Sequence, residues 1–153
     1  MRVKHVTALE IAQRFVGTVE VDGAEDNPLI LAMLKHVAEW PEHDEVPWCS
    51  AFVHFVAMIL DLPAPSQAGL MARSWLTVGQ AVPLDKAEAG FDIVILARGD
   101  DPPGPEVLDA PGHVGFLACV QGSKVLLCGG NQSDSVNISY YPQSRILGIR
   151  RLI

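Results

Sequence analysis

Residues 47–60 read Pro-Trp-Cys-Ser-Ala-Phe-Val-His-Phe-Val-Ala-Met-Ile-Leu. The apolar run from Trp48 to Leu60 is too long for a typical strand, and Pro47 ends the charged loop before it. We therefore expect a helix that begins at or beside Cys49. A thiol at the N-terminus of a helix meets unpaired backbone N–H groups and the positive end of the helix dipole, and both favour the thiolate.

This position suits a nucleophile. The backbone amides that favour the thiolate, that of Cys49 among them, can also stabilise the oxyanion of a tetrahedral intermediate. The small residues after the thiol, Ser50 and Ala51, leave room for a substrate backbone. Spacing alone equally allows a second interpretation, in which Cys49 is a core thiol near the start of a helix.

The rest of the first half of the chain also shows helical patterns. Thr7 and Glu10 have the spacing of a capping box at the start of a helix over 8–17. The Asn-Pro pair at 27–28 is typical of an N-cap and the first position of a second helix. A further helical segment is expected over 66–78.

The second half changes its period from that of helices to that of strands. Glycine and proline interrupt the stretch 98–112, which predicts a long loop, and long loops beside a site are often functional. Helices followed by an antiparallel sheet indicate an α+β fold, with N-terminal helices packed on a C-terminal sheet of about five strands, in a single domain over 1–153. The strands are expected at 91–97, 113–120, 124–128, 136–141 and 146–152.

Composition and charge exclude several classes of function. The formal net charge is -7, and no cluster of Lys and Arg could neutralise a row of phosphates, so no nucleic-acid partner is expected. No apolar run approaches the ~20 residues that a membrane-spanning helix needs, so membrane insertion is not expected. The first residues do not resemble a secretory signal peptide. Three cysteines are too few for a disulfide framework.

A thiol nucleophile needs a base, and His113 is the best candidate among five histidines. It follows a loop, begins a predicted strand and has small neighbours in Gly112-His113-Val114-Gly115. His54 lies five positions after Cys49, which turns it away from the thiol at about 100° per residue, and we expect a core or interface role for it. The others, His5, His36 and His43, are expected to be solvated.

A third residue should orient the imidazole. If 122–123 is a two-residue turn, a regular hairpin register brings His113 opposite Gln132. A bulge at Gly129-Gly130 would instead turn Asn131 to the face of the histidine. The register leaves both amides possible.

Metal and serine chemistry have weaker support. There is no Cys-x-x-Cys, no His-x-x-x-His and no Gly-x-Ser-x-Gly, so neither a zinc site nor a serine hydrolase is expected.

Five motifs, in this order, resemble those of small NlpC-like and CHAP-like cysteine peptidases. They are Pro-Trp-Cys-Ser-Ala-Phe-Val at 47–53, Ala-Arg-Ser-Trp-Leu at 72–76, Gly-Phe-Asp-Ile-Val at 90–94, Gly-His-Val-Gly-Phe at 112–116 and Gly-Gly-Asn-Gln at 129–132.

This resemblance implies a papain-like fold, no cofactor, and cleavage of amide bonds in the peptide part of peptidoglycan. It also implies Cys49 as nucleophile, His113 as base and Asn131 as the orienting residue. Trp48 and Trp75 are candidate walls of the substrate groove, with a core role as the alternative. Asp44 is a candidate for binding the free amine of a stem peptide, with a solvated loop as the alternative.

The expected activity is hydrolysis of a stem-peptide or cross-link amide through a thioester acyl-enzyme. Two alternatives remain: acyl transfer to an amine by the same triad, and a catalytically silent wall-binding or assembly module. By analogy, the expected setting is a phage endolysin or an injected effector, made in the cytoplasm and acting in the periplasm or cell wall. The partners would then be a holin or delivery apparatus, or an immunity protein in the case of an effector.

Overall fold

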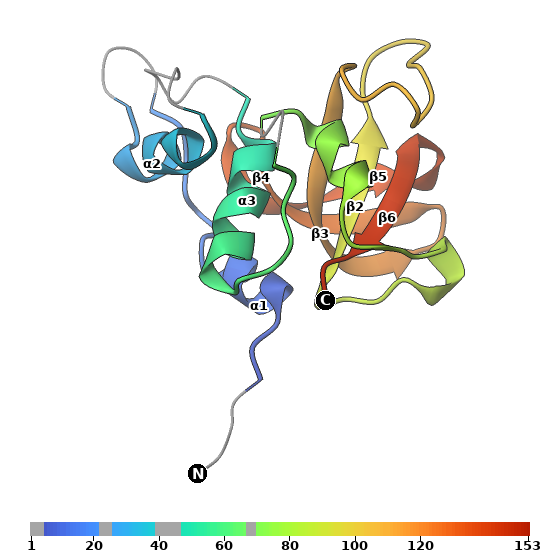
Figure 1. The fold of residues 1–153 in the computed structure, drawn as a ribbon, viewed down its shortest axis with the longest axis horizontal. Coiled ribbons are helices and arrows are strands. Elements are labelled where there is room, and N and C mark those ends of the chain that lie inside the picture. Colours follow the sequence, from blue (N-terminus) through green and yellow to red (C-terminus); the bar gives the residue numbers. More distant parts are fainter. Residues whose placement is uncertain (1–4, 22–25, 39–46, 67–69) are drawn as a thin grey trace.

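The computed structural model describes residues 5–21, 26–38, 47–66 and 70–153. Three helices come first and the sheet follows, which confirms the α+β prediction (Figure 1). The helices are α1 (Ala8–Gln13), α2 (Pro28–Val37) and α3 (Cys49–Ile59). The strands are β1 (Gln80–Ala81), β2 (Asp92–Ala97), β3 (Gly112–Gln121), β4 (Lys124–Gln132), β5 (Ser135–Pro142) and β6 (Ile146–Arg151).

The helices begin where their capping signals predict. The side chain of Thr7 accepts from the backbone of Glu10, and the carboxylate of Glu10 accepts from the backbone of Thr7, so the capping box is present. Asn27 caps α2 through its side chain. The helix over 8–17 was predicted too long, because α1 ends at Gln13. The segment 66–78 is not an α-helix: its regular part is a 3-10 helix over Ala72–Thr77.

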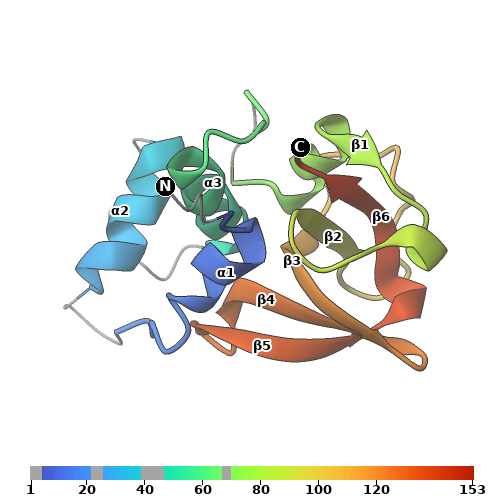
Figure 2. The same ribbon diagram turned by 90° about the horizontal axis from the view of Figure 1, so that it is seen from below.

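The sheet has six antiparallel strands in the order β1-β6-β2-β3-β4-β5 (Figure 2). The five predicted strands are present. The sixth strand, β1, pairs with the last strand, β6. With only two residues, β1 is too short to give a sequence pattern. At the centre of the sheet, the buried carboxylate of Asp92 accepts two hydrogen bonds from Arg151, of 2.7 and 2.9 Å.

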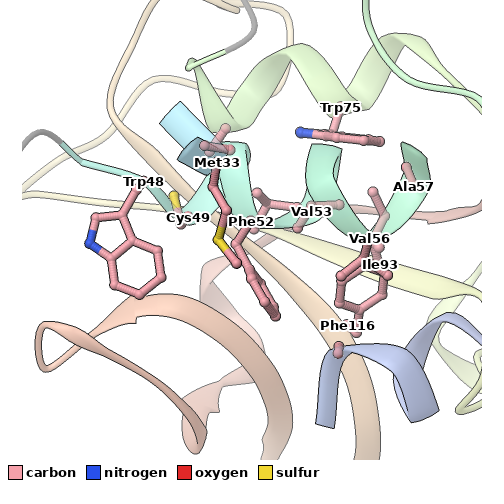
Figure 3. Close-up of a cluster of buried hydrophobic side chains, with 14 of the residues drawn as sticks. Met33, Trp48, Cys49, Phe52, Val53, Val56, Ala57, Trp75, Ile93 and Phe116 are labelled. Carbon is pink, nitrogen blue, oxygen red and sulfur yellow. The ribbon is translucent and has the colours of Figure 1, made fainter. Parts of the chain in front are cut away.

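Helix α3 is the centre of the core, and it packs on β3 and β4. The rings of Phe52 in α3 and Phe116 in β3 meet edge to face, with centroids 6.3 Å apart. Figure 3 shows Met33 of α2 on one side of this cluster and Trp75 on the other side of α3. All four side chains are fully buried, so α3 is fixed from several directions at once.

The contact between Trp48 and β4 is unusually close. A Cβ placed on Gly130 would lie 2.5 Å from Cζ3 of the indole of Trp48 and 2.8 Å from Cβ of Phe52. Only a glycine allows the start of α3 to approach the strand this closely. On its other edge, the Trp48 indole donates a hydrogen bond to Glu20.

A fully buried arginine fixes the long loop between β2 and β3. Arg73, in the 3-10 helix, donates to backbone carbonyls at distances of 2.7 to 3.1 Å. Its acceptors are Pro103, Gly104, Val107 and Pro111. The predicted loop over 98–112 is therefore a folded structure held to the 3-10 helix. Its last residues bound the cavity at Cys49 described below.

Within the ranges that the structure describes, no helix has the length and apolar character to cross a membrane.

We expect Gly130→Ala to lower the free energy of unfolding by about 1–3 kcal/mol, because the new methyl group overlaps the rigid indole of Trp48. Urea unfolding measures this change. In a Trp48→Leu background, where a smaller group replaces the indole, Gly130→Ala should lower the free energy of unfolding by less. An equal cost of Gly130→Ala in both backgrounds would contradict the contact as the cause.

Candidate active site

Cys49 is the first residue of α3, as predicted. No side chain caps this helix, and the amides of Cys49 and Ser50 in its first turn point at the Cys49 sulfur. The Cys49 side chain is 3% exposed and lies beside the start of β3, where the backbone amide of Val114 points at its sulfur. All three cysteines of the chain are reduced.

The sulfur borders a cavity of ≈ 270 Å³. One wall is the end of the loop that Arg73 holds, and the other is the segment before the 3-10 helix. The lining residues are Pro47, Cys49, Leu70, Met71, Ala72, Arg98, Asp109, Ala110, Pro111 and Gly112. The thiol is therefore buried on most sides but borders a space that a substrate could fill.

Burial raises the pKa of the Cys49 thiol above its ordinary value. The amide of Val114 and the cation of Arg98 act in the opposite direction, as do the amides of Ser50 and Cys49, but they do not outweigh the loss of hydration. The expected thiolate at the helix N-terminus is thus not the resting form. A neutral thiol at this position would need a base to act as a nucleophile.

His113 supplies an imidazole in its neutral form. The residue is 4% exposed, and burial lowers its pKa to about 4, with Gln132 opposing this shift and Arg98 adding to it. Its Nε2 atom lies 3.0 Å from Oε1 of Gln132 and 3.3 Å from the hydroxyl of Tyr141. His113 immediately precedes Val114, whose backbone amide points at the Cys49 sulfur, so the imidazole and the thiol are carried by neighbouring positions of the fold.

The orienting amide is held in place by a second set of hydrogen bonds. Nε2 of Gln132 donates to the backbone carbonyl and to the side-chain oxygen of Asn137, both at 2.9 Å. Asn137 donates in return to the carbonyl of Gln132 at 2.6 Å. Since the NH2 group is used in this way, the carbonyl oxygen must face the histidine, and the imidazole donates from Nε2.

The assignment of Asn131 as the orienting residue is corrected by this geometry. Gln132 contacts the imidazole, while Asn131 adopts a left-handed conformation, with φ of 57°, and lines the cavity beside His113. The resemblance pointed to Asn131, and the simple hairpin register pointed to Gln132.

Two bulges explain this outcome. The turn at 122–123 has the predicted register, but β3 is shifted by a bulge at 117–119. A second irregularity at 129–132 in β4 then inserts one residue relative to β5. The second bulge was considered from the glycine pair, but the first has no sequence signal, and together they leave Gln132 on the side of the histidine.

Two further residues, Gly129 and Tyr141, lie against the His113–Gln132 pair and were not predicted. A Cβ on Gly129 would lie 2.7 Å from Oε1 of Gln132, so glycine makes room for the amide. The ring of Tyr141 lies beside the imidazole, with centroids 5.1 Å apart. Burial raises the pKa of Tyr141 to about 12, which keeps its hydroxyl protonated. The sequence predicts Tyr141 in a strand. Its contact with His113 of β3 could not be predicted, because it depends on the order of the strands in the sheet.

A second cavity, of ≈ 290 Å³, lies beside His113. Arg98 borders both this cavity and the one at Cys49. The residues that line the cavity beside His113 are Leu96, Ala97, Arg98, His113, Asn131, Gln132, Ser133, Tyr141, Pro142 and Arg145.

The remaining predicted site residues do not join this centre. Trp48 and Trp75 are fully buried, so their suggested role as groove walls is corrected to a core role. The Trp75 indole donates to the hydroxyl of Ser50 at 2.9 Å, which braces the first turn of α3. Asp44 lies outside the described residues. His54 is buried against Trp75, with ring centroids 4.7 Å apart, in agreement with the expected core role.

In the ranges that the structure describes, no three His, Cys, Asp or Glu side chains are grouped as a metal site would require.

Comparison with solved structures identifies the fold. The chain superposes on NlpC1 from Trichomonas vaginalis with a TM-score of 0.56, over 99% of this chain at 14% identity. NlpC2 from the same organism matches with a TM-score of 0.48, over 99% of this chain at 17% identity. The chain spans 46% of the length of NlpC1 and 48% of that of NlpC2. No family model and no curated protein sequence matches. The protein therefore has an NlpC-like α+β fold.

The buried imidazole should make the protein less stable in acid. A histidine with an ordinary pKa of 6.5 in the unfolded chain binds a proton that His113 takes up only near pH 4 in the fold. The contribution of the neutral His113 to the free energy of unfolding is complete above pH 6.5. It is lost as the pH falls to about 4, and the total loss is ~3 kcal/mol.

Urea unfolding from pH 7 to pH 4.5 measures this loss. His113→Asn should make the pH dependence shallower by about one proton. His36→Asn, which changes an exposed histidine of α2, should leave it as in the wild type. The same slope in all three proteins would show that His113 is not the residue responsible.

Proposed function

We propose that this protein hydrolyses amide bonds in the peptide part of peptidoglycan, with Cys49 as nucleophile, His113 as base and Gln132 as the orienting residue. The observation that supports the proposal is a neutral imidazole, fixed by Gln132 at 3.0 Å, on the residue before Val114, whose backbone amide points at a thiol at the start of a helix. This is the arrangement of a Cys-His-amide triad.

The reaction begins with proton transfer from the thiol to His113 as the sulfur attacks the substrate carbonyl. The imidazolium formed is stabilised by the oxygen of Gln132. The amide of Cys49, at the uncapped start of α3, stabilises the oxyanion. His113 then gives its proton to the nitrogen of the leaving amine, the C–N bond breaks, and a thioester remains. Water, activated by the same imidazole, hydrolyses the thioester and regenerates the thiol.

The choice of peptidoglycan rests on the five motifs that resemble NlpC-like and CHAP-like peptidases, and the fold agrees with them. The acidic chain, at -7, has no general attraction for an anionic wall polymer, so recognition must come from the shape and the local charges of the cavities. A role as a phage endolysin or delivered effector stays a prediction.

Cys49→Ala should abolish the release of peptide fragments from purified murein, with a loss in rate of at least ~1,000-fold, because the acyl acceptor is removed. Mass spectrometry of the soluble fragments measures this and identifies the amide that is cut. Cys119→Ala, which removes an exposed thiol, is the matched control and should retain full activity. Undigested murein with the wild-type protein would end the proposal. Product formation that depends on an added amine would instead favour the transferase alternative.

Gln132→Ala should lower kcat by about 10- to 100-fold with a small change in KM, because the imidazole loses its orienting acceptor. Asn131→Gly, which suits the left-handed backbone at that position, should cost less than about 10-fold. Steady-state kinetics measure kcat and KM of both variants. The substrate is a peptide that contains the amide bond identified in the murein digest. A larger loss for Asn131→Gly than for Gln132→Ala would restore Asn131 as the orienting residue.

A further inference from the structure

The cavity beside His113 carries an unusual charge for this protein. Acidic residues outnumber Lys and Arg by 18 to 11 in the chain, yet the residues lining this cavity include two arginines, Arg98 and Arg145, and no carboxylate. The neighbouring cavity at Cys49, by contrast, contains Asp109 as well as Arg98. Positive charge is thus concentrated on the histidine side of the site.

Arg98 lies where this charge can act on the reacting groups. It borders both cavities, and its cation acts on the pKa of Cys49, of His113 and of Tyr141. The residue is exposed and has no ion pair to a carboxylate within the described ranges. Its guanidinium is therefore open to an anionic group of a ligand.

Arg145 fixes the segment that carries Arg98. Its Nη1 atom donates to the carbonyl of Gly99 at 2.7 Å, which ties the start of the loop after β2 to the turn before β6. A binding group on a held segment loses less entropy when it meets its ligand. Arg145 also adds a second positive charge at the rim of the same cavity.

The proposed mechanism places one half of the substrate beside the imidazole. The histidine that takes the proton of the thiol must return it to the leaving nitrogen, so the amine component lies on the His113 side of the sulfur. The acyl component stays bonded to Cys49. Arg98 borders both the cavity at Cys49 and the cavity beside His113, so it lies within reach of a leaving residue on the imidazole side of the sulfur.

We propose that Arg98, at the border of the two cavities, binds a carboxylate of the residue that leaves as an amine. This inference rests on the proposed hydrolase function and narrows its substrate class. The preferred substrates are amides whose amine component is an amino acid with a free carboxylate close to the scissile nitrogen. An arginine pairs with a carboxylate through two parallel hydrogen bonds, which makes it selective for that group over a carboxamide.

Synthetic stem peptides in matched pairs test this inference. One pair is made for each amide bond of the stem, and its members differ only in whether the leaving residue has a free carboxylate or a carboxamide. The wild type should cleave the carboxylate member with a kcat/KM about 10- to 100-fold higher. Arg98→Gln should reduce this ratio to less than about 3-fold, and Arg98→Lys should retain part of it.

The ratio within a pair is independent of any general loss of activity, so a merely structural effect of the substitution does not change it. Arg14→Gln, which removes an exposed arginine at the end of α1, is the matched control and should keep the wild-type ratio. A second series carries the same exchange on the acyl component, and there Arg98→Gln should have no effect on the ratio.

The outcomes separate the two proposals. Cleavage with equal rates for both members, a preference that survives in Arg98→Gln, or a preference that follows the acyl carboxylate would overturn the carboxylate subsite while the hydrolase function stands. No cleavage of any pair by the wild type, together with intact murein, would overturn the hydrolase function and the subsite with it.

Discussion

The approach of α3 to β4 at Gly130 is the constraint on which the candidate site depends. The indole of Trp48 fills the space that any side chain at position 130 would need, and Cys49 follows Trp48 directly. Since β4 also carries the amide that orients His113, this one packing contact sets the helix, the sulfur and the Gln132 amide in a common frame. In the proposed reaction the buried tryptophan would act through position alone, without touching a substrate.

Within this frame, burial prevails over the helix dipole. A helix N-terminus stabilises a nearby negative charge by about 0.3–1 kcal/mol, and by up to ~2 kcal/mol in partly buried positions. Removing a thiolate from water shifts its pKa by up to several units in the other direction. The sulfur and the imidazole are therefore both neutral at rest, and in the proposed mechanism charge separates only when a substrate carbonyl is present. In that mechanism the dipole and the amide of Cys49 stabilise the oxyanion and so lower the barrier.

The sequence predicts the fold well where signals are local. Capping residues, the proline before Trp48 and the change of period near residue 90 were sufficient for the helices and five of the strands, and for the nucleophile and base as candidates. The prediction was less complete where long-range geometry decides. Gln132 replaces Asn131 because of a bulge in β3 that leaves no trace in residue types. Tyr141 and Arg73 meet their partners only through strand order and loop packing, and the burial of Trp75 depends on a hydroxyl in α3.

The neutral state of the Cys49 thiol has a consequence for the durability of the protein. Peroxides and other electrophiles react with thiolates and hardly at all with thiols, so oxidation to sulfenic acid follows the population of the ionised form. A sulfur that is 3% exposed and protonated at rest escapes most of this damage. The exposed Cys119, near the far end of β3 from His113, is then the thiol that an oxidising environment would modify first, and its loss would leave the proposed site intact.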